Sequence, residues 1–150
     1  MRTRTSLIPA LLCVAGGLCA QDQKANAKAL VKEAIAMAKA KGLQALLKEV
    51  NNPKGRFHVQ SGEDNYIFVY GEDGTCLGQG FRGNLVGVNR MNVKDPDGKF
   101  YIQELIKTGL SKGGGWVDYK YPNPTTGKVL DKTTYVESFD GKIVGCGVYK

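Results

Sequence analysis

Residues 113–150 of the sequence are GGGWVDYKYPNPTTGKVLDKTTYVESFDGKIVGCGVYK, and this stretch contains three candidate β-strands separated by two turn sequences. The strands are predicted over residues 116–121, 133–139 and 142–149, which are rich in β-branched and aromatic side chains. The intervening PNPTTGK and FDGK contain the proline, asparagine, aspartate and glycine residues that favour tight turns. The C-terminal part of the chain therefore predicts an antiparallel meander.

Two helices, a hairpin and a third, shorter helix are predicted upstream of the meander. Residues 24–41, KANAKALVKEAIAMAKAK, repeat apolar side chains at helical spacing, and after Gly42 the pattern resumes in LQALLKEVNN until Pro53 ends it. The segment NYIFVYGEDGTCLGQG, residues 65–80, places β-rich runs on both sides of a glycine-bounded turn. Residues 99–110 have the pattern of a short helix. This order of elements predicts the α+β class with an antiparallel sheet.

The length of 150 residues and the 42% hydrophobic content suit a single domain with one core. At the N-terminus, MRTR is followed by an apolar run over residues 7–18 and by the small Ala20. This is the pattern of a secretory signal peptide, and the run is shorter than the roughly 20 residues that span a bilayer. We therefore expect cleavage of residues 1–20 after Ala20, and a periplasmic or secreted domain over residues 21–150.

The charge pattern and the absence of catalytic motifs narrow the function classes. Removing the two arginines of the signal peptide leaves 19 basic and 14 acidic residues, a net charge of +5 spread along the chain, which disfavours a nucleic-acid groove. His58 is the only histidine, and no serine or cysteine lies in a nucleophile motif. Residues 93–104, VKDPDGKFYIQE, are similar to a calcium loop but begin with Val93 where the first ligand should be. No enzymatic activity, metal or cofactor is therefore expected.

Several segments carry a family resemblance: FVYGEDGTCLGQG, NLVGVNRMNVKDPDGKFYIQELI, GGGWVDYKYPNPTTGKV and KIVGCGVY. Together they resemble a single Cache domain, an extracytoplasmic sensor module related to PAS folds. The resemblance implies a five-stranded antiparallel sheet in the order 2-1-5-4-3, with the long N-terminal helix on one face and a small-ligand pocket on the other. It also implies a small carboxylate ligand such as acetate, propionate, pyruvate or lactate. Many members of the family are the sensing parts of chemoreceptors and histidine kinases.

Strand alternation puts aromatic residues together with Gly145 and Gly147 on one face of the sheet, and aliphatic residues on the other. We expect the glycines to leave hollow volume beside the rings, and tyrosine hydroxyls with one lysine to hold the carboxylate. Lys132, predicted just before the fourth strand, is the expected cation, and alternation puts it opposite Tyr135 unless a bulge intervenes. The predicted ligand-binding residues are Phe68, Gln79, Trp116, Tyr119, Tyr121, Lys132 and Tyr135.

These residues also have a purely structural interpretation, because rings on strands commonly fill a core, and Lys132 and Gln79 could be solvated. The competing function is therefore a structural or protein-interaction module whose pocket is filled by its own rings. Under the leading hypothesis the partners are a small organic acid and a membrane receptor or kinase, with a homodimer through the N-terminal helix as a further partner. Residues 81–98 are long enough to act as a lid over the ligand.

The predicted mature chain has two cysteines, Cys76 and Cys146. In the strand order that the resemblance implies, they flank the first strand at about 9 to 10 Å from each other. A disulfide needs Cα atoms within about 7 Å. We therefore expect two buried, unpaired thiols.

Overall fold

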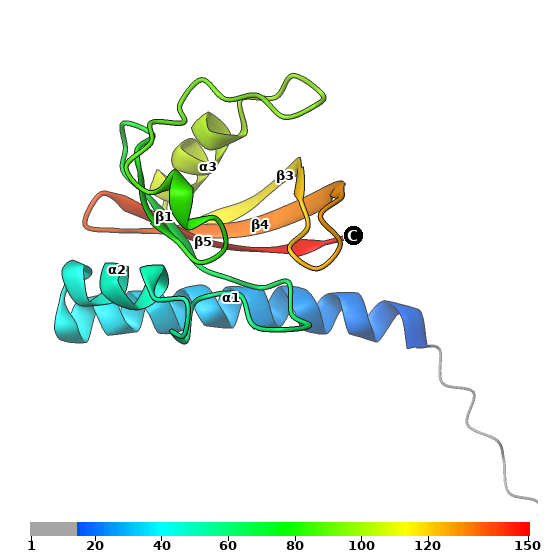
Figure 1. Cartoon of the computed structure of the whole chain (residues 1–150), viewed down its shortest axis with the longest axis horizontal. Coiled ribbons are helices and arrows are strands. Elements are labelled where there is room, and N and C mark those ends of the chain that lie inside the picture. The colour runs from blue at the N-terminus through cyan, green and yellow to red at the C-terminus, as the bar shows by residue number, and fades with distance from the viewer. Residues whose placement is uncertain (1–14) are drawn as a thin grey trace, which may run out of the picture.

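A five-stranded antiparallel sheet separates the helices into two layers in the computed structural model, which describes residues 15–150 (Figure 1). Helices α1 (Ala15–Lys41) and α2 (Leu43–Asn51) cover one face of the sheet, and α3 (Tyr101–Leu110) covers the other. The remaining elements are β1 (Phe68–Tyr70), β2 (Cys76–Gln79), the short 3-10 helix η1 (Gly83–Leu85), β3 (Gly115–Pro122), β4 (Val129–Phe139) and β5 (Lys142–Tyr149).

The strands lie in the order β2-β1-β5-β4-β3, and every neighbouring pair is antiparallel. The predicted α+β class and the strand order implied by the resemblance are therefore confirmed. The meander of β3, β4 and β5 pairs in continuous register. Its second turn places Asp140 and Gly141 at φ values of 49° and 68°, the left-handed backbone of a two-residue hairpin turn.

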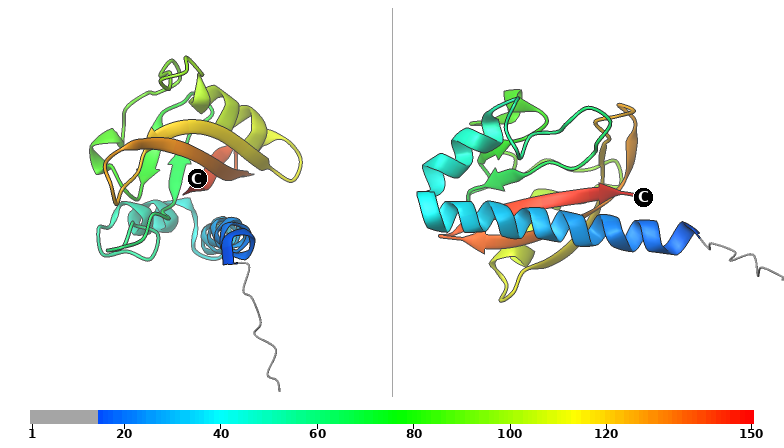
Figure 2. Two further views of the ribbon diagram at one scale, coloured as in Figure 1. Left: turned by 90° about the vertical axis from the view of Figure 1, so that its right-hand side faces the viewer. Right: turned by 90° about the horizontal axis from the view of Figure 1, so that it is seen from below.

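Helix α1 lies along β5 (Figure 2), and it packs a stripe of small side chains on the sheet. Ala27, Ala34 and Ala38 are at most 2% exposed, so the helix approaches the strands closely. Gly42 separates α1 from α2 with a φ of 90°, a conformation that residues with a Cβ atom rarely adopt. Two consecutive helices are confirmed, although α1 already begins at Ala15 rather than at residue 24.

The two faces of the sheet carry different cores, which we call the α1 face and the α3 face. The α1 face is largely aliphatic and includes side chains from the helices and from the strands: Val31, Leu46, Ile67, Val69, Val144, Cys146 and Val148. The α3 face gathers most of the buried rings: Tyr66, Phe68, Tyr70, Tyr101, Tyr119 and Tyr121. The predicted alternation of side chains along β1, β3 and β5 is confirmed.

Cys76 and Cys146 are both buried and free, as predicted. They lie in β2 and β5, the two strands that flank β1. Their side chains also belong to opposite faces of the sheet, since Cys76 packs on the α3 face and Cys146 on the α1 face. The strand order and the alternation of side chains thus both separate the thiols.

The predicted signal peptide of residues 1–20 stays a prediction, because residues 1–14 lie outside the described residues and residues 15–20 belong to α1. Within residues 15–150, none of the helices combines the length with the apolar character that a bilayer span requires.

Candidate ligand-binding site

A small cavity lies on the α3 face, between the sheet and α3. Its volume is about 10 Å³, which is room for about one water molecule. Its lining consists of Tyr66, Phe68, Tyr70, Gln79, Tyr101, Ile102, Leu105, Tyr119, Tyr121 and Lys132. The structure therefore brings together five of the predicted ligand-binding residues, namely Phe68, Gln79, Tyr119, Tyr121 and Lys132.

Lys132 is a buried cation enclosed by aromatic rings. It lies inside β4 rather than just before the strand, and it is 1% exposed. Its Nζ atom donates a hydrogen bond to the hydroxyl of Tyr66 at 2.9 Å, and the centroids of four tyrosine rings lie 4.5 to 5.9 Å away. No carboxylate within residues 15–150 forms an ion pair with it. Burial therefore lowers the pKa of Lys132 to about 7.

Arg90 brings a second buried cation to the same group of tyrosines. It lies between η1 and α3, is 8% exposed, and has no ion-pair partner within residues 15–150. Its Nη1 atom donates to the hydroxyls of Tyr70 and Tyr121 at 3.4 and 3.3 Å, and its Nη2 atom donates to the hydroxyl of Tyr101 at 2.7 Å. Sequence reasoning missed Arg90, because no strand or helix period assigns a direction to side chains in an irregular segment.

The tyrosine hydroxyls around the cavity are arranged to act as donors. The hydroxyl of Tyr66 accepts a hydrogen bond from Lys132, and those of Tyr70, Tyr101 and Tyr121 accept from Arg90. Within residues 15–150 no acceptor takes the hydrogens of Tyr101 and Tyr121, so these two hydroxyls can donate to a ligand. Burial raises the pKa of Tyr66, and it raises the pKa of Tyr101 to about 12, so both phenols stay protonated at neutral pH. Phenol donors next to two cations are suited to binding a carboxylate.

The space beside Gly145 and Gly147 is occupied by the protein's own side chains. A Cβ atom on Gly145 would overlap the ring of Phe68, and one on Gly147 would overlap the side-chain stem of Lys132. The predicted hollow is therefore mostly filled, because the missing Cβ atoms admit one ring and one lysine stem. The small cavity described above is what remains.

Trp116 and Tyr135 lie on the α1 face, and the structure does not bring them to the cavity. They pair across β3 and β4 with ring centroids 5.3 Å apart, and Lys24 and Lys28 of α1 lie 5.3 and 5.2 Å from the two rings. The pairing of β4 with both of its neighbours is continuous, so no bulge brings Tyr135 to the side of Lys132. The prediction that Tyr135 lines the ligand pocket with Lys132 is therefore wrong, because the two-residue period of β4 places these two side chains on opposite faces of the sheet.

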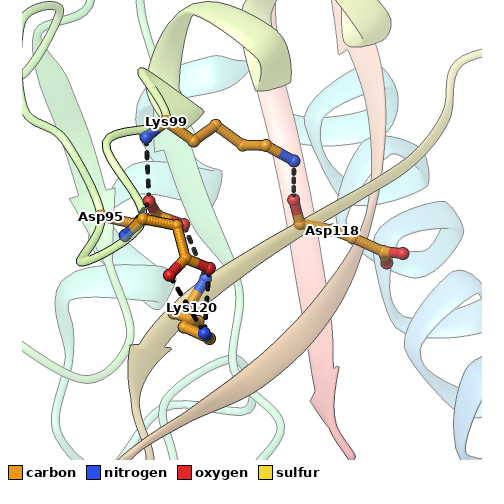
Figure 3. Close-up of polar contacts among 5 residues, drawn as sticks. Asp95, Lys99, Asp118 and Lys120 are labelled. Atoms are coloured by element: carbon orange, nitrogen blue, oxygen red, sulfur yellow. Dashed lines mark hydrogen bonds and ion pairs between the residues drawn. The ribbon is translucent and has the colours of Figure 1, made fainter.

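The predicted lid, residues 81–98, is fastened to the rest of the protein near its C-terminal end (Figure 3). Asp95 is 8% exposed, and its carboxylate accepts the backbone N–H of Lys120 in β3 at 3.1 Å as well as N–H groups of its own loop. Lys99 donates to the backbone carbonyl of Asp118, also in β3. These bonds hold the loop against the edge strand and give a structural reason for an aspartate in the calcium-like sequence.

A larger groove, with a volume of about 510 Å³, lies between α1 and the segment of residues 56–65. Its Arg56 forms an ion pair with Glu33 of α1 at 3.1 Å. This guanidinium already has an anionic partner, whereas the cations beside the small cavity have none within residues 15–150. We therefore take the small cavity on the α3 face as the candidate site.

Two curated proteins are similar to parts of this chain. The sensor histidine kinase MctS of Rhizobium johnstonii is 41% identical over 90 residues, which is 59% of this chain and 19% of the kinase. The methyl-accepting chemotaxis protein McpP of Pseudomonas putida is 34% identical over 59 residues, which is 38% of this chain and 11% of the receptor. The matches therefore span less than a fifth of the length of either relative.

Solved structures share the fold. A methyl-accepting chemotaxis protein from Vibrio parahaemolyticus superposes with a TM-score of 0.74 at 22% identity, covering 88% of this chain and 91% of that one. A Cache chemosensory domain described as recognising carboxylic acids superposes with a TM-score of 0.69 at 24% identity, covering 90% of this chain and 98% of that one. At these identities the likeness supports the fold alone.

The family model described as single Cache domain 2 matches residues 14–150. Its extent covers nearly the whole chain, and the folds of the solved Cache and chemotaxis sensor domains agree with it. Domains of this kind are extracytoplasmic sensors of chemotaxis receptors and histidine kinases. The chain therefore belongs to the single Cache domain 2 family.

Proposed function

We propose that this domain binds a small organic carboxylate of two to four carbons in the cavity on the α3 face and relays its occupancy to a partner. The observation that carries the proposal is the convergence of two buried cations, Lys132 and Arg90, on one group of tyrosines, without an acidic partner within residues 15–150. Burying a cation without an anion is unfavourable, so a carboxylate that enters this site supplies the missing counter-charge.

The remaining lining suits the rest of a short acid. Phe68, Ile102 and Leu105 contribute apolar surface to the cavity. A small-molecule site of this kind combines apolar walls with a few polar groups that fix the ligand's orientation. The apolar side chains would contact the carbon chain, while the ammonium and the phenol hydrogens would hold the carboxylate.

Binding requires the cavity to enlarge, because about 10 Å³ holds a water molecule and not an acid. The cavity has the sheet on one side and α3 on the other. Arg90 joins the two, since it donates to Tyr101 in α3 and to Tyr121 in β3. An acid that competes for these hydroxyls would shift α3 relative to the sheet, and we propose this shift as the signal that the partner detects.

The proposed partner is a membrane receptor or a sensor kinase, and the proposed location is the periplasm or the exterior, after cleavage of residues 1–20. Support comes from the two curated relatives, a sensor kinase and a chemotaxis receptor. The matched family and the solved neighbours are sensor domains, so we propose binding without turnover of the acid. The Cache neighbour described as recognising carboxylic acids supports the ligand class.

A thermal-shift titration with acetate, propionate, pyruvate and lactate tests the proposal. We expect at least one acid to raise the melting temperature of the purified protein in a saturable manner. Lys132→Met should abolish the shift, whereas Lys128→Met, at an exposed position after β3, should retain it. A flat response to every acid up to millimolar concentrations would contradict the proposal.

The second candidate function is a structural or interaction module whose pocket is filled by its own side chains. The observation that favours it is the small cavity, together with the placement of Phe68 and Lys132 over Gly145 and Gly147. This alternative predicts no thermal shift with any acid and association of two copies through α1. Sedimentation or size-exclusion measurements with substitutions on the exposed side of α1 would identify such a dimer.

A further inference from the structure

Gln79 lines the cavity and has a buried side-chain carbonyl without a hydrogen-bond partner. It is the last residue of β2, is 3% exposed, and lines the cavity together with Lys132. Its Oε1 atom is buried and accepts no hydrogen bond from any residue within the described part of the chain. Buried polar atoms without partners are few in native proteins, and each is unfavourable unless a further group satisfies it. This oxygen therefore marks a position where a ligand donor would complete the site.

Hydrogen bonds with α2 and pairing with β1 hold the backbone at Gln79 in place. Its N–H donates to Oδ1 of Asn51 at 2.9 Å, while Nδ2 of Asn51 donates to the carbonyl of Leu77 at 3.2 Å. Asn51 is the last residue of α2, so a single side chain ties this helix to β2. Gln79 also pairs with Phe68 of β1. The amide thus reaches the cavity from a fixed strand rather than from a loop.

We propose that Gln79 makes the site selective for 2-hydroxy acids, such as glycolate and lactate, by accepting a hydrogen bond from the ligand's hydroxyl. This inference rests on the proposed function, in which Lys132 and the tyrosine hydroxyls hold the carboxylate. The phenol oxygens of four lining tyrosines already accept from Lys132 or Arg90. Gln79 Oε1 is the buried acceptor of the lining that has no donor within residues 15–150.

Two related classes of acid fit this arrangement less well. An amino acid carries a donor next to its carboxylate, but its ammonium would approach two cations in a cavity that no acidic side chain lines. A 2-keto acid brings another acceptor, which leaves Oε1 unpaired in the amide orientation of this structure. A hydroxyl is a neutral donor, so it satisfies the carbonyl without adding positive charge.

Isothermal titration calorimetry on the purified protein tests the inference with matched pairs of acids. We expect lactate to bind at least about tenfold more tightly than propionate, and glycolate more tightly than acetate, because the unsubstituted acids leave the carbonyl unpaired. Pyruvate should resemble propionate, and alanine should bind most weakly. The wild-type comparison needs no substitution and decides the ligand class by itself.

Gln79→Met tests the role of the residue, since it keeps a side chain of similar length and removes the acceptor. We expect the preference for lactate over propionate to fall below about twofold, and the melting temperature of the ligand-free protein to rise, because no unpaired carbonyl is then buried. A merely structural glutamine would lower the melting temperature on removal. Gln44→Met, at an exposed position of α2, is the control and should change neither quantity.

The outcomes separate the two proposals. If no acid binds, the proposed function is overturned and this inference with it. If acids bind but lactate and propionate have equal affinities in the wild type, only the inference is overturned. If the preference survives in Gln79→Met, Gln79 does not cause it and its proposed role is wrong.

Discussion

The α1 face and the α3 face of the same sheet are built from different chemistry. The α1 face buries mainly aliphatic side chains and cysteine against α1 and α2, and most of these side chains need no polar partner. The α3 face buries tyrosines, Gln79, Lys132 and Arg90, whose polar atoms must find partners there. Burial of aliphatic groups favours folding, whereas burial of a cation or an unpaired carbonyl opposes it. The comparison indicates that the α1 face stabilises the fold without a ligand, whereas the α3 face combines an apolar core with the binding chemistry.

The largest expected effect comes from the α1 face. Leu46→Ala should lower the free energy of unfolding by about 2 to 5 kcal/mol, because Leu46 is fully buried in this core and its truncation leaves a cavity. Urea denaturation checks this value. The affinity of the folded variant for an acid should be unchanged, and a large loss of affinity would contradict the division of roles between the faces.

A substitution in the α3 face should not lower the free energy of unfolding in this way. Lys132→Met replaces a buried cation with an apolar side chain, so we expect the ligand-free protein to be as stable as the wild type at pH 7, or more stable by about 1 to 3 kcal/mol. The wild type should gain stability relative to this variant as pH rises from about 7 towards 10.5, since the unfolded chain then holds a proton that the folded Lys132 has released. A strongly destabilised variant would show that Lys132 serves the fold.

The affinity for the acid should depend on pH. Below about pH 7 Lys132 is protonated and the affinity should be constant, as long as the acid itself remains ionised. Above that pH the free site loses its ammonium, so the dissociation constant should rise by up to about tenfold per pH unit. Calorimetry between pH 6 and pH 9 measures this slope, and a flat profile would show that Lys132 does not contact the carboxylate.

The smallest expected effect concerns a single hydroxyl on each face. Tyr121→Phe removes one donor from the cavity and should weaken acid binding by about 0.5 to 1.5 kcal/mol. Tyr135→Phe removes a hydroxyl on the α1 face, where it donates to the carbonyl of Gly113, and should leave the affinity unchanged. Equal losses in the two variants, measured by calorimetry, would contradict the assignment of the faces.

The regular elements could be predicted from the sequence because their periods are local properties. The alternation in β3 groups Tyr119 with Tyr121, and the expected placement of both on the pocket side with Phe68 is confirmed by the structure. The strand order came from the family resemblance and not from the periodicity. The composition of both faces could therefore be predicted from side-chain alternation together with the strand order that the resemblance implies.

The site was harder to predict, because its residues come from segments without such a period. Arg90 reaches the tyrosines from an irregular segment, and Tyr101 reaches them from α3, whose position over the sheet depends on tertiary packing. The predicted pocket includes Tyr135 although alternation opposes this, and the continuous register of β4 decides against it. The filling of the space beside Gly147 depends on the rotamer of Lys132, which no sequence pattern specifies.

The most direct test of the central claim is an NMR titration of the Lys132 ammonium in protein labelled at its lysine side chains, with the signal assigned by its absence from Lys132→Met. The account predicts a pKa near 7 in the ligand-free protein, which rises by at least about one unit when a binding acid saturates the site. An ordinary lysine pKa in the ligand-free protein, or a low value that no acid changes, would contradict the account.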